Sequence, residues 1–185
     1  MIRLFAALSL PPQIALVLTP RQNGIRGARW RPVESLHVTL RFFGEIAEDV
    51  AADLDAALAD VNAPAFEAQL SGVGCFGEGA GVDAVWAGVA DNPDLGRLAR
   101  ACETAARRAG LKPETRRYRP HVTLAYLRRP DPAAVAAWIQ DHNLLASPPF
   151  GVDSFGLYSS WLGRSGSGYR LERTYTLTPR KPPAP

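Results

Sequence analysis

The sequence ESLHVTLRFFGE spans residues 34–45, and the sequence YRPHVTLAYLRR spans residues 118–129. Both contain the tetrapeptide HVTL, which begins at His37 and again 84 residues later (121 minus 37) at His121. The chain has three histidines, so two of them stand at the same place in the same motif. This repetition indicates an internal duplication and makes both motifs candidate functional segments.

The first HVTL segment is predicted to be a strand with one polar and one apolar face. Side chains two residues apart in a strand point to the same side of the sheet. His37 and Thr39 therefore share the exposed face, whereas Val38, Leu40 and Phe42 are expected to face the core.

The second motif follows the same alternation. His121 and Thr123 share the exposed face, and strand parity places Tyr126 on the core side. In each motif the imidazole and the hydroxyl are about 6.6 Å apart along the strand. One phosphate group can bridge that gap.

Two histidines and two threonines suit chemistry at phosphorus if a twofold axis brings the strands together. Displacement at phosphorus needs a base, an acid and donors for the non-bridging oxygens. Imidazole has an ordinary pKa near 6.5 and can serve as either base or acid. Zinc is the alternative use of two histidines, but it takes three or four protein ligands, and no carboxylate or thiol lies on the histidine faces. We therefore expect no metal and no other cofactor.

The order of predicted elements repeats after 84 residues as strand, helix, HVTL strand, helix, strand. We predict an α+β fold, internally duplicated, with two βαβαβ-like lobes whose antiparallel sheets enclose a central cleft. The lobes are expected at about residues 1–76 and 82–161, followed by a C-terminal hairpin at 162–178 and a disordered tail at 179–185. GRSGSG (163–168) is predicted to be a turn, because it lacks the Lys-Ser/Thr and the helix of a P-loop.

Composition sets the broad class of the protein. The 185 residues carry a net charge of +3, which suits an anionic partner but leaves nucleic acid and other partners equally open. No run of 18 apolar residues occurs, so we expect a soluble protein with no membrane partner. The two cysteines, Cys75 and Cys102, form no framework, which favours a reducing compartment and a cytoplasmic location.

A repeated H-x-T-hydrophobic motif on two strands of a duplicated domain resembles the two-histidine (2H) phosphoesterase superfamily. The surrounding sequence is similar to its RNA 2',3'-cyclic phosphodiesterase branch, historically called 2'-5' RNA ligases. The resemblance extends over nearly the whole chain, in RLFAALSLP (3–11), RWRPVESLHVTLRFFGE (29–45), RRYRPHVTLAY (116–126) and LYSSWLGRSGSGYRLE (157–172).

This resemblance implies one bilobal phosphoesterase domain over residues 1–185, which hydrolyses RNA 2',3'-cyclic phosphodiester ends to 2'-phosphomonoesters without metal. It implies His37 as proton donor, His121 as proton acceptor, and Thr39 and Thr123 as phosphate-binding residues. The implied partner is an RNA with such an end, for example a tRNA half or another short RNA. Reversible 2'-5' ligation is possible in principle, and we expect a monomer.

The chain departs from the family at Tyr126, where relatives often carry an arginine. Arg41 shares a predicted face with His37, so we expect it to bind the phosphate instead, although a solvated arginine at a strand end fits the pattern nearly as well. Further basic and aromatic residues precede each motif and suit single-stranded RNA. These are Arg29, Trp30 and Arg31 before the first motif, and Arg116, Arg117, Tyr118 and Arg119 before the second.

Two other functions remain open on the sequence. One is hydrolysis of a small cyclic phosphate, such as a nucleoside or ADP-ribose derivative, which would gain nothing from a longer RNA strand. The other is a non-catalytic module that binds RNA ends, whose binding would be salt-sensitive and would survive loss of both motif histidines.

Overall fold

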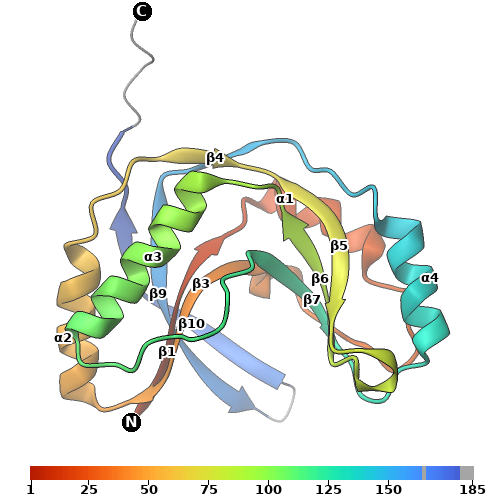
Figure 1. Ribbon diagram of the computed structural model, residues 1–185, viewed down its shortest axis with the longest axis horizontal. Helices are drawn as coiled ribbons and strands as arrows, with labels where there is room; N and C mark the ends of the chain where they lie inside the picture. The colour runs from red at the N-terminus through yellow and green to blue at the C-terminus, as the bar shows by residue number, and fades with distance from the viewer. Residues whose placement is uncertain (164–165, 180–185) are drawn as a thin grey trace, which may run out of the picture.

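The computed structural model describes residues 1–163 and 166–179 of the chain. It shows an α+β protein in which antiparallel strands form two curved wings (Figure 1). Helices α2 (Glu48–Ala59) and α3 (Pro93–Arg108) lie on one side of the molecule and α4 (Pro132–His142) on the other. The predicted fold class is confirmed.

The first half of the chain contains β1 (Ile2–Ser9), α1 (Pro12–Leu18), β2 (Arg29–Trp30), β3 (His37–Ile46), α2 (Glu48–Ala59), β4 (Phe66–Ala68) and β5 (Leu70–Phe76). The second half contains β6 (Ala84–Val89), α3 (Pro93–Arg108), β7 (His121–Tyr126), α4 (Pro132–His142), β8 (Phe150–Val152), β9 (Ser154–Gly163) and β10 (Gly166–Thr176). Short 3₁₀ turns lie at Thr19–Arg21, Val33–Ser35 and Gly79–Gly81.

Local sequence explains the ends of α3. Asn92 precedes the helix, and its side-chain oxygen accepts hydrogen bonds from the backbone N–H groups of Asp94 and Leu95. Pro93 occupies the first turn, where its missing N–H costs nothing. Gly110 follows the helix with φ of +79°, a left-handed conformation that glycine adopts without strain.

The strands of the main sheet lie in the order β10-β9-β1-β3-β7-β6-β5, and β2 also pairs with β7. We call β10, β9, β1 and β3 the first wing, and β7, β6, β5 and β2 the second wing. The wings meet where β3 and β7 pair at Val38 and Val122. The two HVTL strands therefore lie side by side at the centre of the sheet.

Strand register reveals the twofold relationship between the halves. Val38 pairs with Val122 in the main sheet, and Glu67 pairs with Gly151 where β4 and β8 form a small second sheet. Both pairs join residues 84 apart in sequence. Antiparallel pairs of equivalent residues are what an approximate twofold axis produces, so the predicted duplication is visible in the backbone.

Each wing contains strands from both halves of the sequence. The last strand of the first repeat, β5, pairs with β6 in the second wing, and β9 of the second repeat pairs with β1 in the first wing. Helix α3, from the second repeat, packs against α2 and β3. Whereas the sequence predicts lobes of consecutive residues, the structure shows repeats that exchange their final strands.

The predicted C-terminal hairpin is formed by β9 and β10, which pair along their length. The hairpin begins at Ser154 and not at the predicted residue 162. Residues 164–165, which belong to the stretch predicted to be a turn, lie outside the described residues, as do residues 180–185 of the predicted disordered tail.

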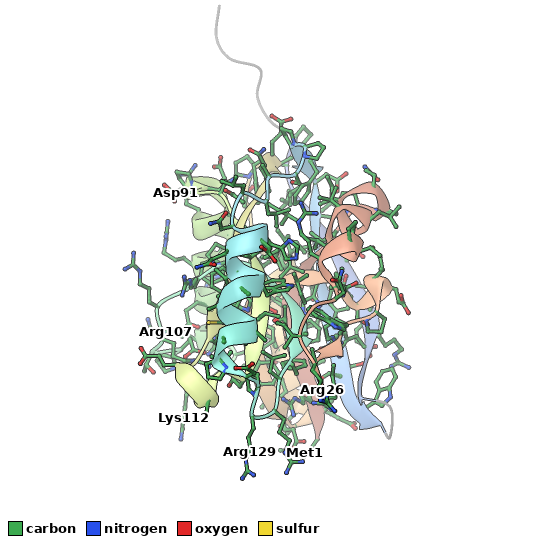
Figure 2. All side chains as sticks on the ribbon, turned by 90° about the vertical axis from the view of Figure 1, so that its right-hand side faces the viewer. Met1, Arg26, Asp91, Arg107, Lys112 and Arg129 are labelled. Carbon is green, nitrogen blue, oxygen red and sulfur yellow. The ribbon has the colours of Figure 1, made fainter. Side chains whose placement is uncertain are left out.

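Apolar side chains from both wings and the helices form one continuous core. Charged side chains such as Arg107, Lys112 and Arg129 extend outward from the ribbon (Figure 2). Among the described residues, no helix has the length and apolar character needed to cross a membrane.

Candidate active site

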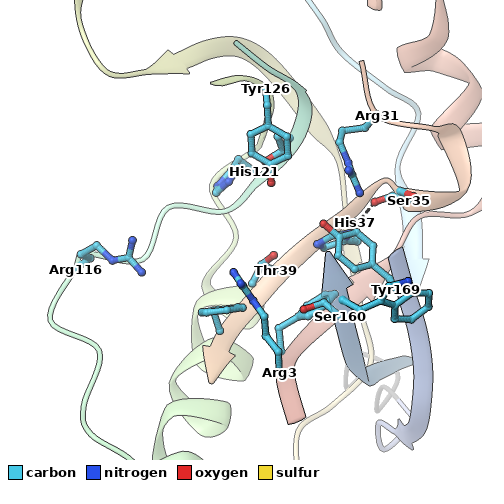
Figure 3. Close-up of a pocket in the computed structure, with 14 residues that line it drawn as sticks. Arg3, Arg31, Ser35, His37, Thr39, Arg116, His121, Tyr126, Ser160 and Tyr169 are labelled. Atoms are coloured by element: carbon cyan, nitrogen blue, oxygen red, sulfur yellow. Dashed lines mark hydrogen bonds between the residues drawn. The ribbon is translucent and has the colours of Figure 1, made fainter. Parts of the chain in front are cut away.

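Both HVTL strands line a pocket of about 370 Å³, here called the HVTL pocket (Figure 3). His37 and Thr39 reach it from β3, and His121 and Thr123 reach it from β7. The structure thus brings together four of the five residues that the sequence singled out. The fifth, Arg41, does not line the pocket.

The two histidines are held in the same way. The Nδ1 atom of His37 lies 2.8 Å from the carbonyl oxygen of Ser35, and that of His121 lies 2.7 Å from the carbonyl oxygen of Arg119. A carbonyl oxygen only accepts hydrogen bonds, so each Nδ1 carries the hydrogen and donates it. The Nε2 nitrogen of each neutral ring is left with a lone pair that can take a proton.

Aromatic rings enclose both imidazoles. The centroid of the His37 ring lies 5.0 Å from that of Phe5 and 5.2 Å from that of Tyr169. The His121 ring meets Phe76 edge-on at 4.7 Å and lies 6.2 Å from Trp86. These contacts fix the ring planes and keep water away from one side of each imidazole.

Burial keeps both histidines neutral near pH 7. It lowers the pKa of His37 from its ordinary 6.5 to about 4, an effect that the charges of Arg31 and His121 reinforce and the bond to Ser35 opposes. Burial also lowers the pKa of His121. A bound phosphodiester would add a negative charge beside both rings and thereby favour their protonated forms.

The position of Arg41 differs from the one that the sequence analysis predicted. The sequence places it on the face of His37, but Leu40 is the extra residue of a β-bulge: Thr39 pairs with Ala7, and Arg41 pairs with the next residue, Ala6. The bulge turns Arg41 away from the HVTL pocket.

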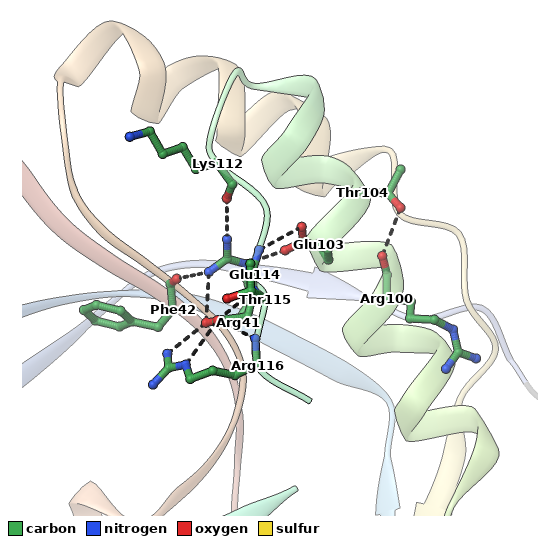
Figure 4. Close-up of polar contacts among 9 residues, drawn as sticks. All are labelled: Arg41, Phe42, Arg100, Glu103, Thr104, Lys112, Glu114, Thr115 and Arg116. Atoms are coloured by element: carbon green, nitrogen blue, oxygen red, sulfur yellow. Dashed lines mark hydrogen bonds and ion pairs between the residues drawn. The ribbon is translucent and has the colours of Figure 1, made fainter. Parts of the chain in front are cut away.

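The guanidinium of Arg41 is bound to acidic and carbonyl groups instead (Figure 4). Its Nε donates to Glu103 at 2.5 Å, its Nη2 donates to the carbonyl oxygen of Lys112 at 2.8 Å, and its Nη1 lies 3.7 Å from a carboxylate oxygen of Glu114. The prediction that Arg41 faces the phosphate site is therefore wrong.

A second bulge of the same kind lies in β7, and the two bulges together change the predicted positions of Phe42 and Tyr126. In β7, Thr123 pairs with Trp86 and Ala125 with Val85, which leaves Leu124 as the extra residue. Phe42 and Tyr126, which strand parity assigned to the core, both line the HVTL pocket and are partly exposed. The two bulges are 84 residues apart, so they belong to the repeat.

Three arginines, Arg3, Arg31 and Arg116, supply positive charge, and none of the described residues lining the pocket is acidic. The guanidinium of Arg31 lies over the rings of Tyr169 and Tyr126, at 5.0 and 5.8 Å from their centroids. Its Nη2 atom is buried and has no hydrogen-bond partner among the described residues. An unpaired donor at this place suits a phosphate oxygen.

Arg116 is tied to the network around Arg41. Its Nε and Nη2 atoms donate to the carboxylate of Glu114 at 3.1 and 2.8 Å. The hydrogen bonds from Arg116 lower the pKa of Glu114 to about 2, so this carboxylate is charged at neutral pH. Arg41 therefore acts on the pocket indirectly, because it helps to hold the partner of Arg116.

Four further aromatic or histidine residues differ in whether they lie in the core, at a helix end or in the pocket. Trp30 packs against Trp138 and the core, and the hydroxyl of Tyr118 donates to the carbonyl oxygen of Thr39 at 3.2 Å. His142 contacts Trp138 at the end of α4, away from the pocket. Tyr169, by contrast, lines the pocket although the sequence analysis left it out.

Sequence reasoning missed the residues that neighbouring strands contribute. Arg3 and Phe5 come from β1, Ser160 and Trp161 from β9. The sequence contained one sign that Arg3 is functional, because it is a charged residue inside the apolar strand IRLFAALS. Assigning Arg3 to the pocket would still have required the order of the strands in the sheet.

Within residues 1–163 and 166–179, no group of three or more His, Cys, Asp and Glu side chains is arranged to hold a metal ion.

Residues 11–163 match the model of the 2'-5' RNA ligase superfamily. The chain belongs to this superfamily. The membership confirms the resemblance that the paired HVTL motifs carry.

Several relatives support this membership. The RNA 2',3'-cyclic phosphodiesterase of Aeropyrum pernix is 34% identical over 74% of this chain and 79% of its own length. The enzyme of the same name from Thermus thermophilus is 32% identical over 95% of this chain and 90% of its own length. Escherichia coli LigT, solved in complex with 3'-AMP, superposes with a TM-score of 0.76 at 27% identity, covering 96% of this chain and 98% of LigT. The present chain and LigT thus share one fold over nearly the whole length of both proteins.

Proposed function

We propose that this protein is an RNA 2',3'-cyclic phosphodiesterase that forms 2'-phosphomonoester ends by metal-free acid-base catalysis. The observation that carries the proposal is the matched pair of histidines, which line the same pocket and each have Nδ1 bound to a carbonyl oxygen. This bonding leaves Nε2 as the nitrogen that can exchange a proton. The names of the curated relatives support the same reaction. The described residues would act as one bilobal phosphoesterase domain.

In the proposed reaction, water attacks phosphorus opposite the departing 3' oxygen of the ribose. His121 Nε2 takes a proton from the water as the new P–O bond forms. Protonated His37 gives its Nε2 proton to the 3' oxygen as the P–O3' bond breaks, which leaves the phosphate on the 2' oxygen. Solvent then returns the two imidazoles to their starting protonation states.

Donors around the pocket would hold the phosphate during this displacement. The hydroxyls of Thr39 and Thr123 donate to the non-bridging oxygens, and Arg31 supplies the charge that the sequence analysis assigned to Arg41. Donors fixed before the reaction stabilise the charge that gathers on these oxygens in the transition state.

Attack of an RNA 5' hydroxyl in place of water would form a P–O5' bond as the P–O3' bond breaks and so give 2'-5' ligation, with His121 again as base and His37 again as acid. Hydrolysis should prevail in dilute solution, because water is the more abundant nucleophile. We further propose that the protein acts as a monomer in the cytoplasm on tRNA halves or other short RNA, since its two free cysteines suit a reducing compartment.

The test is to incubate the protein, in excess EDTA, with a short RNA that ends in a 2',3'-cyclic phosphate, and to identify the terminal phosphate. His37→Ala and His121→Ala are compared with His142→Ala, which removes the histidine outside the pocket. We expect a 2'-phosphate from the wild type and His142→Ala, and a loss of at least about 100-fold in rate in each motif variant.

Two outcomes would contradict the proposal. If the wild type binds the RNA but leaves its end intact, the chain is a binding module. If EDTA abolishes activity that added metal restores, the metal-free mechanism is wrong. Equal rates on a nucleoside 2',3'-cyclic phosphate and on the RNA would instead favour a small cyclic phosphate as substrate.

A further inference from the structure

A second hollow of about 520 Å³ adjoins the HVTL pocket and is not used by the chemistry proposed above. Arg3, Ser160 and Trp161 line both spaces. Arg170 and Glu45 complete the charged part of its wall. The shared residues make the second hollow a continuation of the reaction site along the first wing.

Trp161 has the properties of an aromatic platform. It stands on β9, and 54% of its surface is exposed, which is unusual for the largest apolar side chain. Gly168 of β10 is its direct cross-strand neighbour. A Cβ atom on Gly168 would lie 2.4 Å from two atoms of the indole ring. The ring therefore packs against the glycine backbone while about half of its surface stays exposed.

Two arginines of this region, Arg3 and Arg170, could meet the phosphates of a nucleic acid strand. Arg3 lies on the shared wall, with its guanidinium 4.9 Å from the centre of the Phe42 ring. Arg170 is oriented by Glu172, whose carboxylate accepts hydrogen bonds from its Nε and Nη2 at 2.9 and 3.0 Å. Flat aromatic faces beside arginines are how proteins hold unpaired bases and their phosphates.

We propose that the second hollow binds the nucleotide that precedes the cyclic phosphate end, with its base stacked on Trp161 and its phosphate near Arg3. This inference rests on the proposed function, because it places the terminal nucleotide in the HVTL pocket. The protein then distinguishes an RNA end from a mononucleotide through a residue that takes no part in the chemistry.

The test compares kcat/KM for adenosine 2',3'-cyclic phosphate with kcat/KM for the adenylate dinucleotide that ends in the same group. We expect the wild type to prefer the dinucleotide by about 5-fold or more, the range that base stacking on an aromatic side chain provides. Trp161→Ala should remove this preference, because it lowers kcat/KM for the dinucleotide much more than for the mononucleotide. Trp161→Phe should keep most of it, and Gly168→Ala should weaken it because the added methyl group displaces the indole.

Leu171→Ala is the matched control, because Leu171 is also an exposed apolar residue of the hairpin and lines neither space. Its preference should equal that of the wild type. A wild type without preference, or a Trp161→Ala variant that loses equally on both substrates, would overturn the inference.

Failure of the proposed function would give a different result, because the wild type would then hydrolyse neither substrate. If neither substrate is hydrolysed, stacking on Trp161 is tested by calorimetry, which measures the Kd values for adenosine 3'-phosphate and for the dinucleotide ending in a 3'-phosphate. A preference for the dinucleotide that Trp161→Ala abolishes supports the platform, and equal affinities refute it.

Discussion

The guanidinium of Arg31 lies 5.0 Å from the centre of the Tyr169 ring and keeps its buried Nη2 unpaired among the described residues. Arg31 belongs to the first repeat, but its backbone N–H donates to the carbonyl oxygen of Leu124 in the second motif, at 2.8 Å. The side chain thus bridges the two repeats at the pocket. It stands near the residue, Tyr126, that replaces the arginine often found in relatives.

Arg31→Ala should therefore lower kcat/KM for a cyclic phosphate end by about 10- to 100-fold, because one charge-assisted hydrogen bond to the phosphate is lost. The variant should also raise the pKa of His37, since the charge of Arg31 lowers it. Steady-state kinetics across a pH series measure both effects. Arg29→Ala, an exposed neighbour on β2, serves as control, and an equal loss there would point to a nonspecific effect of charge.

The pH dependence of kcat/KM follows from the two lowered histidine pKa values. The proposed catalysis needs one protonated and one neutral imidazole, and this form is most abundant between the two pKa values of the free protein. Because burial lowers both from 6.5, kcat/KM should be highest below pH 6.5. The optimum of kcat should lie at higher pH, because bound phosphodiester favours protonated histidine. A kcat/KM optimum at or above pH 7 would contradict the proposed protonation states.

The same burial makes the folded state sensitive to acid. Between pH 6.5 and about pH 4, unfolded chains bind a proton at residue 37 that the folded protein does not. The free energy of unfolding should therefore fall as the pH falls through this window, with a contribution from His37 of about 3 kcal/mol. Urea titrations at pH 7 and pH 4 measure the change. His37→Gln should reduce it, His142→Gln should not, and equal changes in all three proteins would exclude His37 as the cause.

Arg41 offers a test of positioning without contact to substrate. Arg41→Ala leaves Glu103 and Glu114 without their shared cation, and we expect the free energy of unfolding to drop by about 2 kcal/mol. Freed Glu114 should also hold Arg116 less firmly, which raises KM more than it lowers kcat. Arg100→Ala, an exposed arginine of the same helix as Glu103, is the control. A large fall in kcat alone would indicate a direct catalytic role for Arg41.

Alternation and repetition in the sequence were enough to predict the α+β class, the duplication and the meeting of His37, Thr39, His121 and Thr123. The predicted alternation of side chains is wrong beyond Leu40 and Leu124, because a bulge adds one residue at each of these positions. Neither bulge contains a glycine, so nothing in the sequence indicated it. Arg41 was therefore assigned to the wrong face.

The remaining pocket residues depend on contacts that local sequence does not specify. Arg3 joins the site because β1 pairs with β3, and Tyr169 joins it because β9 and β10 follow β1 in the sheet. Tyr169 is 132 residues from His37 (169 minus 37), and nothing in the pattern around either residue indicates that their rings meet.

The exchange of β5 and β9 also makes a prediction for folding. A break after Gly79 would separate β5 from β6, its one partner among the described strands of the main sheet, and β1 from β9. We expect fragments 1–79 and 80–185 to be largely unfolded alone and to regain strand signal in circular dichroism when mixed. A fragment that folds alone would show that the exchanged strands are dispensable.

This interlocking has a consequence for the origin of the molecule. A half-length ancestor with the same topology could bury its core only by trading its last strand with a second copy, as a domain-swapped homodimer. Such a dimer would have carried two equivalent histidines related by a true twofold axis. Within a single chain the two copies are free to differ, as Phe42 and Tyr126 do at equivalent positions. Under the proposed mechanism, the same freedom lets one histidine serve as acid and the other as base.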